Sequence, residues 1–185
     1  ADQPPPALVN RLARRWQESG GDLRAVLSLL FASPEFRAPA VFGAKFKTPI
    51  QYVVSAIRAG GLPVTNLQPL LGTLNRLGQP LYGCLTPDGY QNTRAAWLNP
   101  DALSLRLDFA SALGAGSLPL DRLPPGEPGT NATPPAPAKR TPTPLDSARL
   151  ATLIDLSPST QATVAAAAPP LRAALILGSP EFLSR

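Results

Sequence analysis

Apolar residues recur along this chain at the spacing of helix faces. Leu8, Leu12 and Trp16 stand four residues apart between three prolines and Gly20-Gly21, and they predict a first helix. Asp22 then provides a good N-cap for a second helix, whose apolar positions follow at i, i+3, i+4, i+7 and i+8. This spacing predicts one buried face, formed by Leu23, Val26, Leu27, Leu30 and Phe31.

The pattern continues in the middle of the chain. A third helix is expected from Thr48-Pro49 to Gly60-Gly61, with Ile50, Val53, Val54 and Ile57 facing inward. A fourth is indicated before Gly78 by Leu67, Leu70, Leu71, Leu74 and Leu77. A fifth starts at Asn99-Pro100 and should be the central, most buried helix, because its apolar residues cover more than one face. These residues are Leu103, Leu105, Leu107, Phe109 and Leu113.

The last forty residues predict further helices. Leu150, Leu153 and Ile154 mark a sixth, residues 162–168 a possible seventh, and Pro169-Pro170 opens an eighth. Strand patterns have almost no support, since residues 40–42 and 80–82 are at most short extended pieces. The fold class expected is all-α, an irregular multi-helix bundle with a long proline-rich loop and no substantial sheet.

Five predicted helix starts share one sequence motif, a capping side chain directly before proline. Proline pushes its predecessor out of the α region, as an N-cap requires, and at the first helical position its missing N–H costs no hydrogen bond. The five pairs are Ser33-Pro34, Thr48-Pro49, Asn99-Pro100, Ser157-Pro158 and Ser179-Pro180.

Residues 117–144 differ in kind, because nine of these 28 residues are proline. Such a composition buries too little apolar surface to offset the entropy of ordering. We therefore divide the chain into a helical domain at 1–116, a proline-rich loop or linker at 117–144, and C-terminal helices at 145–185 that pack on the same domain.

Composition excludes several kinds of chemistry. The chain has no histidine and one cysteine, so it cannot supply a Ser-His-Asp triad, an imidazole metal ligand, an internal disulfide or a CxxC zinc site. We expect no metal site, and we interpret Cys84 as a small buried hydrophobe. The net charge of +5 does not favour nucleic-acid binding, because the basic residues are scattered. No apolar run is long enough to cross a bilayer.

The chain contains no methionine, not even an initiator. We expect it to be a processed product or one part of a larger gene product. Its first residues show neither the basic nor the apolar stretch of a signal peptide.

Two segments resemble each other, residues 29–36 and 175–182, and each ends in Ser-Pro-Glu-Phe. The structural interpretation is a capping Ser, Pro at the first helical position, Glu at the positive helix end and Phe returning to the core. The alternative makes Glu35 and Glu181 a carboxylate pair for acid–base work, which requires both on one cleft.

Other candidate site residues are polar or aromatic, and no catalytic residue or cofactor can be named among them. The loop at 78–97 carries five of these candidates, and loops held by a rigid scaffold often bear function. The alternative is a structural role, in which Tyr82 and Trp97 anchor the loop onto the helices. Lys45 and Lys47 precede a helix start, where their ammonium groups and the exposed N–H groups of that helix could bind an anion. The alternative is that both lysines are solvated. Arg106 should be partly buried and therefore paired, with Asp101, Asp108 or a carboxylate in the missing part of the larger gene product. The five loop residues are Gln79, Tyr82, Tyr90, Arg94 and Trp97.

The order of motifs resembles the C-terminal part of the bacterial "domain of unknown function 1800" family. The resemblance covers nearly the whole chain except the proline-rich insert, although Cys84 and Tyr90 depart from the family's usual residues. The matching motifs are PPPALV at 4–9, GGDLR at 20–24, SPEF at 33–36, KFKTP at 45–49, LGQPLY at 77–82, PDGY at 87–90, WLNP at 97–100 with Arg106, and SPEF at 179–182.

The resemblance implies a large exported protein, periplasmic or secreted, whose N-terminal part is missing here. It also suggests a partner similar to sulfatases and alkaline phosphatases. We expect a helical scaffold or interaction portion, completed by the missing N-terminal part or by another subunit. The alternative is the C-terminal part of an exported enzyme, hydrolytic or redox, whose catalytic residues lie mostly in the missing region.

Overall fold

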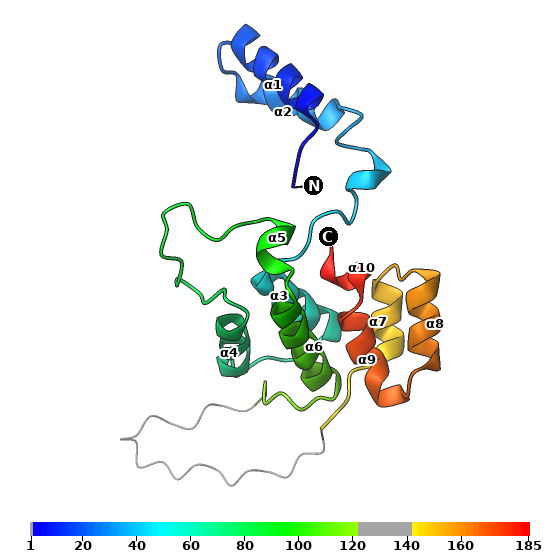
Figure 1. Cartoon of the computed structure of the whole chain (residues 1–185). Helices are drawn as coiled ribbons and strands as arrows, with labels where there is room; N and C mark the ends of the chain where they lie inside the picture. Colours follow the sequence, from blue (N-terminus) through cyan, green and yellow to red (C-terminus); the bar gives the residue numbers. More distant parts are fainter. Residues whose placement is uncertain (1, 122–141) are drawn as a thin grey trace.

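The computed structural model describes residues 2–121 and 142–185, and within these ranges the chain is all-α (Figure 1). The elements are α1 (Pro6–Glu18), α2 (Leu23–Ala32), the 3-10 helix η1 (Pro39–Val41), α3 (Pro49–Gly60), α4 (Gln68–Arg76), α5 (Arg94–Trp97), α6 (Pro100–Gly114), α7 (Ser147–Leu153), α8 (Pro158–Ala166), α9 (Pro169–Leu177) and α10 (Pro180–Leu183). A single antiparallel bridge joins Phe46 to Ser184, and it is the only β pairing in these ranges. The all-α prediction is confirmed.

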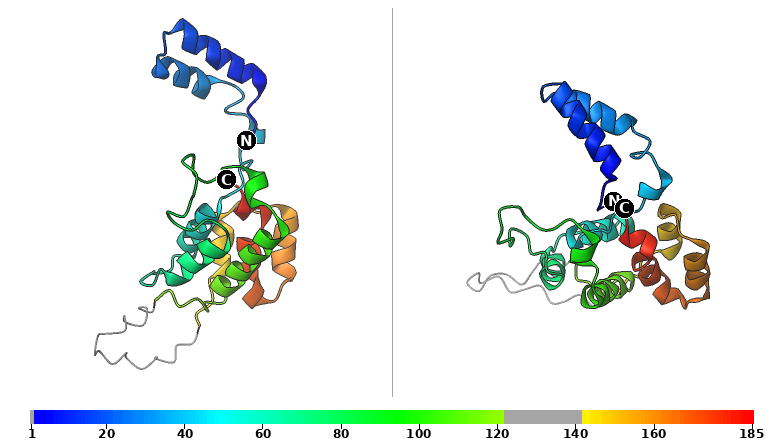
Figure 2. Two further views of the ribbon diagram at one scale, coloured as in Figure 1. Left: turned by 60° about the vertical axis from the view of Figure 1, so that its left-hand side comes forward. Right: turned by 45° about the horizontal axis from the view of Figure 1, so that its top comes forward.

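The helices form a body and a projecting hairpin. Helices α3 to α10 make the body, and the α1–α2 hairpin stands away from it on the linker that contains η1 (Figure 2). Helix α1 packs mainly on α2, whereas α6 packs along α9, and α7, α8 and α10 also contact α9. The N-terminal and C-terminal ends lie near each other where the hairpin meets the body (Figure 1).

Helix α6 is the centre of the core, as its apolar residues on several sides predict. Phe109, Ala110 and Leu113 are buried on it, and they belong to the same cluster as Ile176 and Leu177 of α9. Gly114 allows this close approach, because a Cβ there would lie 3.1 Å from the backbone nitrogen of Ala174. Close packing of two helices thus depends on a residue without a side chain.

The expected caps are present. The Asp22 carboxylate accepts from the Arg24 N–H at 2.9 Å, and the Asn99 side chain accepts from the Ala102 N–H at 2.8 Å. Ser157 and Ser179 accept from the N–H groups of Thr160 and Phe182. Thr48 forms a capping box with Gln51, whose side-chain oxygen accepts from the Thr48 N–H at 3.1 Å. Ser33 is the exception, because it caps a turn by accepting from the Phe36 N–H, and no helix follows.

Several expectations about local structure were wrong. The stretch 78–97 contains the short helix α5, and residues 39–41 form a 3-10 turn where the sequence allowed at most a short extended piece. Helix α8 begins at Pro158, as the Ser157-Pro158 pair predicts, and not at residue 162. Four apolar positions on which the helix predictions rested are exposed. They are Val54, Leu67, Leu107 and Leu153.

The largest departure concerns the second helix, whose apolar face was predicted to be buried. Helix α2 has no buried residue, and the exposed fractions of Leu23, Leu27 and Phe31 are 64%, 46% and 50%. The reason is geometric: α1 covers one side of α2, and the hairpin stands too far from the body for a second cover (Figure 2).

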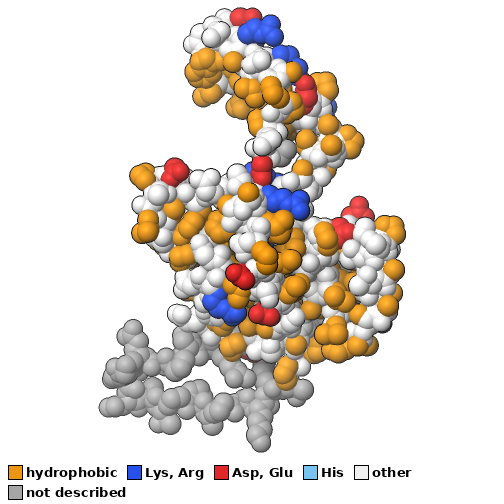
Figure 3. All heavy atoms as spheres, viewed as in Figure 1, with side chains coloured by type: hydrophobic (Ala, Val, Ile, Leu, Met, Phe, Trp, Pro, Cys, Tyr) orange, Lys and Arg blue, Asp and Glu red, His pale blue; other side chains and the backbone are white. Residues whose placement is uncertain are grey.

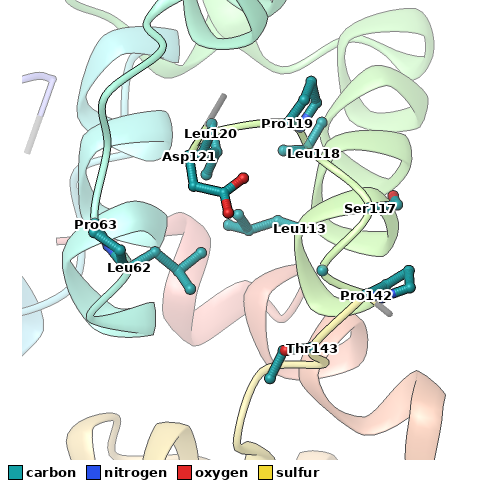
Figure 4. A pocket seen from close by; sticks show the side chains of 11 residues that line it. Leu62, Pro63, Leu113, Ser117, Leu118, Pro119, Leu120, Asp121, Pro142 and Thr143 are labelled. Atoms are coloured by element: carbon teal, nitrogen blue, oxygen red, sulfur yellow. The ribbon is translucent and has the colours of Figure 1, made fainter. Parts of the chain in front are cut away.

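Both described ends of the proline-rich stretch pack on the body. The Leu120 carbonyl accepts from the N–H groups of Thr65 and Asn66 at 2.9 and 2.8 Å, and Leu120 and Leu145 are buried. Between these ends, Leu62 and Leu113 line a pocket of about 420 Å³ (Figure 4). The loop expected at 117–144 is thus anchored at each edge, and its residues 122–141 lie outside the described part.

Replacing Leu113 by Ala tests the assignment of the core. Leu113 is fully buried between α6 and α9, so its truncation should lower the free energy of unfolding by about 2–5 kcal/mol. Urea unfolding measures this change. The matched control is Leu171→Ala on α9, whose side chain is mostly exposed, and it should change the same quantity by about 0.5 kcal/mol or less. Equal losses in the two variants would contradict the assignment.

Candidate functional site

The hairpin, the body and the C-terminal end meet at residues 45–48. Lys45 and Arg185 exchange backbone hydrogen bonds of 3.2 and 2.8 Å, and the Lys47 N–H donates to the Leu183 carbonyl at 2.8 Å. We call the residues around this pairing the junction: Asp2, residues 45–48, Arg94, Arg106 and residues 182–185. It brings together positions that are far apart in the sequence.

Lys45 links the start of the chain to the body. Its ammonium donates to Asp2 Oδ1 at 2.8 Å and to the Asn92 carbonyl at 2.6 Å. The other Asp2 oxygen accepts from the Arg94 N–H at 2.6 Å. This N–H and then the Lys45 ammonium hold the pKa of Asp2 below its usual value. Asp2 therefore ties the foot of α1 to two separate segments of the body.

Lys47 points toward the C-terminal helix. Its ammonium donates to the Phe182 carbonyl at 2.6 Å and lies 4.1 Å from the centre of the Phe182 ring. Burial lowers the pKa of Lys47, and repulsion from Arg106 and Arg185 lowers it further. The positive charge of Lys47 thus has a backbone oxygen and a ring as neighbours, together with two other cations.

Arg106 lies at the base of the junction. Its side chain has an exposed fraction of 0%, and Nη2 donates to the Lys47 carbonyl at 3.0 Å. The guanidinium carbon is 4.7 Å from the centre of the Phe46 ring and 5.0 Å from that of Tyr52. The Tyr52 hydroxyl donates to the Arg106 carbonyl at 3.0 Å. Burial lowers the pKa of Arg106 to about 10 and raises that of Tyr52.

Two of the three carboxylates predicted as possible partners of Arg106 were wrong. Neither Asp101 nor Asp108 pairs with it, and Asp108 instead lies 3.8 Å from the guanidinium of Arg76. Residues two or five positions apart on a helix do not share a face, so neither aspartate reaches the Arg106 side chain. Among the residues of ranges 2–121 and 142–185, Nε and Nη1 of Arg106 have no hydrogen-bond partner.

The start of α3 is the place where an anion was predicted beside Lys45 and Lys47. The Ile50 N–H there donates to the side-chain oxygen of Gln79 at 2.8 Å. Gln79 thus connects the loop at 78–97 to the first turn of α3. Both ammonium groups already donate to oxygens of the chain itself, so an added anion would share each ammonium with these contacts.

The loop at 78–97 is anchored by two aromatic residues. The Tyr90 hydroxyl donates to the Pro80 carbonyl at 2.9 Å, and Trp97 Nε1 donates to the Gln91 carbonyl at 2.6 Å. The expected anchoring by Trp97 is present, whereas that by Tyr82 was wrong, because Tyr82 is fully exposed with φ 57°. Cys84 is also not the buried hydrophobe expected, since it is partly exposed and contacts Thr86.

Comparison with known protein families supports the resemblance suggested by the motifs. Residues 1–184 match the family model described as "Protein of unknown function (DUF1800)". The chain belongs to the DUF1800 family. No curated protein and no solved structure matches it. No helix in the described part of this DUF1800 chain is long and apolar enough to cross a membrane.

The two Ser-Pro-Glu-Phe segments have separate structural roles in this DUF1800 chain. Glu35 accepts from Arg11 at 2.7 Å and so connects α1 to the turn after α2. Glu181 accepts from the Ser157 N–H and from the Thr160 hydroxyl, at the start of α8. The carboxylates thus bind different elements, which does not support the acid–base pair. Phe182 is buried as predicted, whereas Phe36 is about half exposed and packs edge-on against Phe31.

Replacing Glu181 by Gln should change how stability depends on pH. Burial acts to raise the pKa of Glu181, but hydrogen bonds from Ser157, its own backbone and Thr160 outweigh it and lower the pKa to about 2. A depressed native pKa stabilises the fold above the unfolded value of 4.5, and this stabilisation is lost as pH falls toward about 2.

The free energy of unfolding should therefore be lower for Glu181→Gln than for wild type at pH 7, and the gap should narrow between pH 4.5 and 2. Urea unfolding across this pH range measures it. Thr160→Ala, which removes one donor, should reproduce part of the deficit at pH 7. A gap that stays constant with pH would show that the Glu181 charge does not contribute.

Two substitutions of Arg106 separate its volume from its charge. The side chain packs between two rings and makes one hydrogen bond, so Arg106→Ala should lower the free energy of unfolding by about 2–5 kcal/mol through the cavity it leaves. Arg106→Met keeps the volume and removes a buried charge without a carboxylate partner, so it should stay within about 1 kcal/mol of wild type. Equal losses on urea unfolding would mean that the charge itself stabilises the fold.

Proposed function

We propose that this chain is a helical interaction portion of an exported DUF1800 protein, and that its α1–α2 hairpin binds the polypeptide that completes that protein. The observation that carries the proposal is the exposed apolar face of α2. Leu23, Leu27 and Phe31 follow one another at four-residue spacing, so they lie on one side of the helix.

Exposed apolar residues are ordinary when they are scattered, but these are grouped. Phe36 extends the face through its edge-on contact with Phe31, whose ring centre is 5.1 Å away. Trp16 of α1 is also about half exposed. Apolar side chains gather along the hairpin in the space-filling view (Figure 3). We define the α2 face as Leu23, Leu27, Phe31 and Phe36.

The hairpin holds its conformation through contacts that leave the α2 face free. Leu8 is buried on α1, and the Arg11–Glu35 ion pair joins α1 to the turn beyond α2. Asp2 attaches the foot of α1 to Lys45 and Arg94. Helices of 13 and 10 residues are marginal on their own, so a partner on the α2 face would add stability as well as affinity.

The partner that best fits this proposal is another part of the same gene product. Interfaces with permanent partners are more apolar than other interfaces, and such a face is exposed only when the chain is separated from its partner. A different subunit, including one similar to sulfatases or phosphatases, is the second possibility that the family resemblance suggests. Export to the periplasm or outside the cell belongs to the same proposal.

Cross-linking from the α2 face tests the proposal in the full-length protein. A photoreactive amino acid at Leu27 should form a cross-link to a segment outside residues 1–185 of the same gene product, or to one defined subunit, identified by mass spectrometry. The matched control places the same group at Leu171 of α9, which is exposed to a similar degree. Cross-linking that is equally unspecific from both positions would overturn the proposal.

The double variant Leu27→Ser/Phe31→Ser measures the contribution of the α2 face to affinity. Both side chains are about half exposed, so the melting temperature of the separate chain should stay nearly the same. Affinity for the partner found by cross-linking should fall at least about 30-fold, as expected for the loss of a central apolar anchor. Leu171→Ser should leave this affinity unchanged.

A further inference from the structure

The junction holds more positive than negative charge. It contains the cationic side chains of Lys45, Lys47, Arg94, Arg106 and Arg185, and its one side-chain carboxylate, that of Asp2, is engaged by Lys45 and by the Arg94 N–H. Lys47 and Arg106 each donate to a backbone carbonyl and to no carboxylate. The described residues thus leave this cluster without a matching anion.

Arg106 is the clearest sign of this imbalance. Arginine is rarely buried without a charged partner, since removing a charge from water costs several kcal/mol. The rings of Phe46 and Tyr52 offset part of this cost through cation–π contact. They do not satisfy Nε and Nη1, which have no acceptor among residues 2–121 and 142–185.

We propose that the junction receives a carboxylate group from a side chain of the polypeptide that binds the α2 face. The location of the two surfaces supports this occupant, because the junction lies at the foot of the hairpin (Figure 1). The identity of the donor polypeptide rests on the proposed function, whereas the preference of the junction for a carboxylate does not.

The approach to the site is from the solvent side of Lys47. Arg185 is exposed and Lys47 is half-buried, whereas Arg106 lies beneath the Phe46 ring. An incoming carboxylate meets Lys47 and Arg185 first and accepts from a Lys47 N–H that the Phe182 carbonyl does not use. Its negative charge also relieves the repulsion between Lys47 and Arg106.

Acetate is the probe for the carboxylate preference. The melting temperature of the separate chain should be higher in sodium acetate than in sodium chloride at equal ionic strength, because a ligand bound to the native state stabilises it. Lys47→Met should abolish this difference. Arg76→Gln removes an exposed cation on α4 and should keep it in full. An acetate effect that is absent in wild type, or equal in all three proteins, overturns the proposal.

A second measurement, on the wild-type chain, tests carboxylate binding at the junction if Lys47→Met does not fold. In a chain with ¹⁵N-labelled arginine, the Nε–H resonance of Arg106 should move on addition of acetate and remain in place on addition of chloride. The Arg76 resonance is the internal control. No acetate-specific movement of the Arg106 resonance overturns the proposal.

The source of the carboxylate is tested separately. In the complex with the partner identified by cross-linking, the site is filled, so acetate should no longer raise the melting temperature. An undiminished acetate effect in the complex assigns the site to a free carboxylate molecule and overturns the partner as donor. The variant Leu27→Ser/Phe31→Ser should no longer bind the partner, but acetate should still raise its melting temperature. The two measurements therefore distinguish failure of this inference from failure of the proposed function.

Discussion

The packing of the buried Arg106 side chain is the interaction around which the junction is organised. This side chain projects from α6, the central helix of the core, and binds the Lys47 carbonyl while two rings cover it. Residues 45–47 in turn pair with residues 183–185, and Lys45 holds Asp2. One side chain therefore supports the pairing of segments from both ends of the chain, and the hairpin is attached just above it.

The core and the hairpin occupy separate parts of the molecule. The contact of α6 with α9 buries the large apolar side chains, and Gly114 lets the two backbones approach. The junction adds Phe46, Phe182 and Leu183 to this core, whereas no hairpin residue belongs to it. Both regions carry features that a self-sufficient domain would avoid, namely an uncovered apolar face on the hairpin and cations without carboxylates at the junction. Both features lie at the same end of the body, which is why we interpret them together as a surface prepared for a partner.

The two Ser-Pro-Glu-Phe segments show how one local motif leads to different results. In both, the serine accepts a backbone hydrogen bond from the phenylalanine three residues later, because this geometry depends only on neighbouring residues. Around residues 179–182 the body surrounds the motif, and Phe182 is buried between Tyr52 and Lys47. Around residues 33–36 no body is near, so Phe36 stays exposed on the hairpin.

The sequence by itself determined most of the helices, four of the five proline-assisted helix starts and the central position of α6, because capping and periodicity act within a few residues. It did not indicate α5, whose four residues are too short for a periodic pattern and whose Thr93 makes no side-chain cap. It also predicted burial for the α2 face and an aspartate on α6 as a possible partner for Arg106. Only the tertiary structure decided these points, since burial and charge pairing depend on which distant segments come together. The α2 face is uncovered because the hairpin stands apart, and Arg106 faces Lys47 because α6 presents it to the junction and its aspartates to other sides.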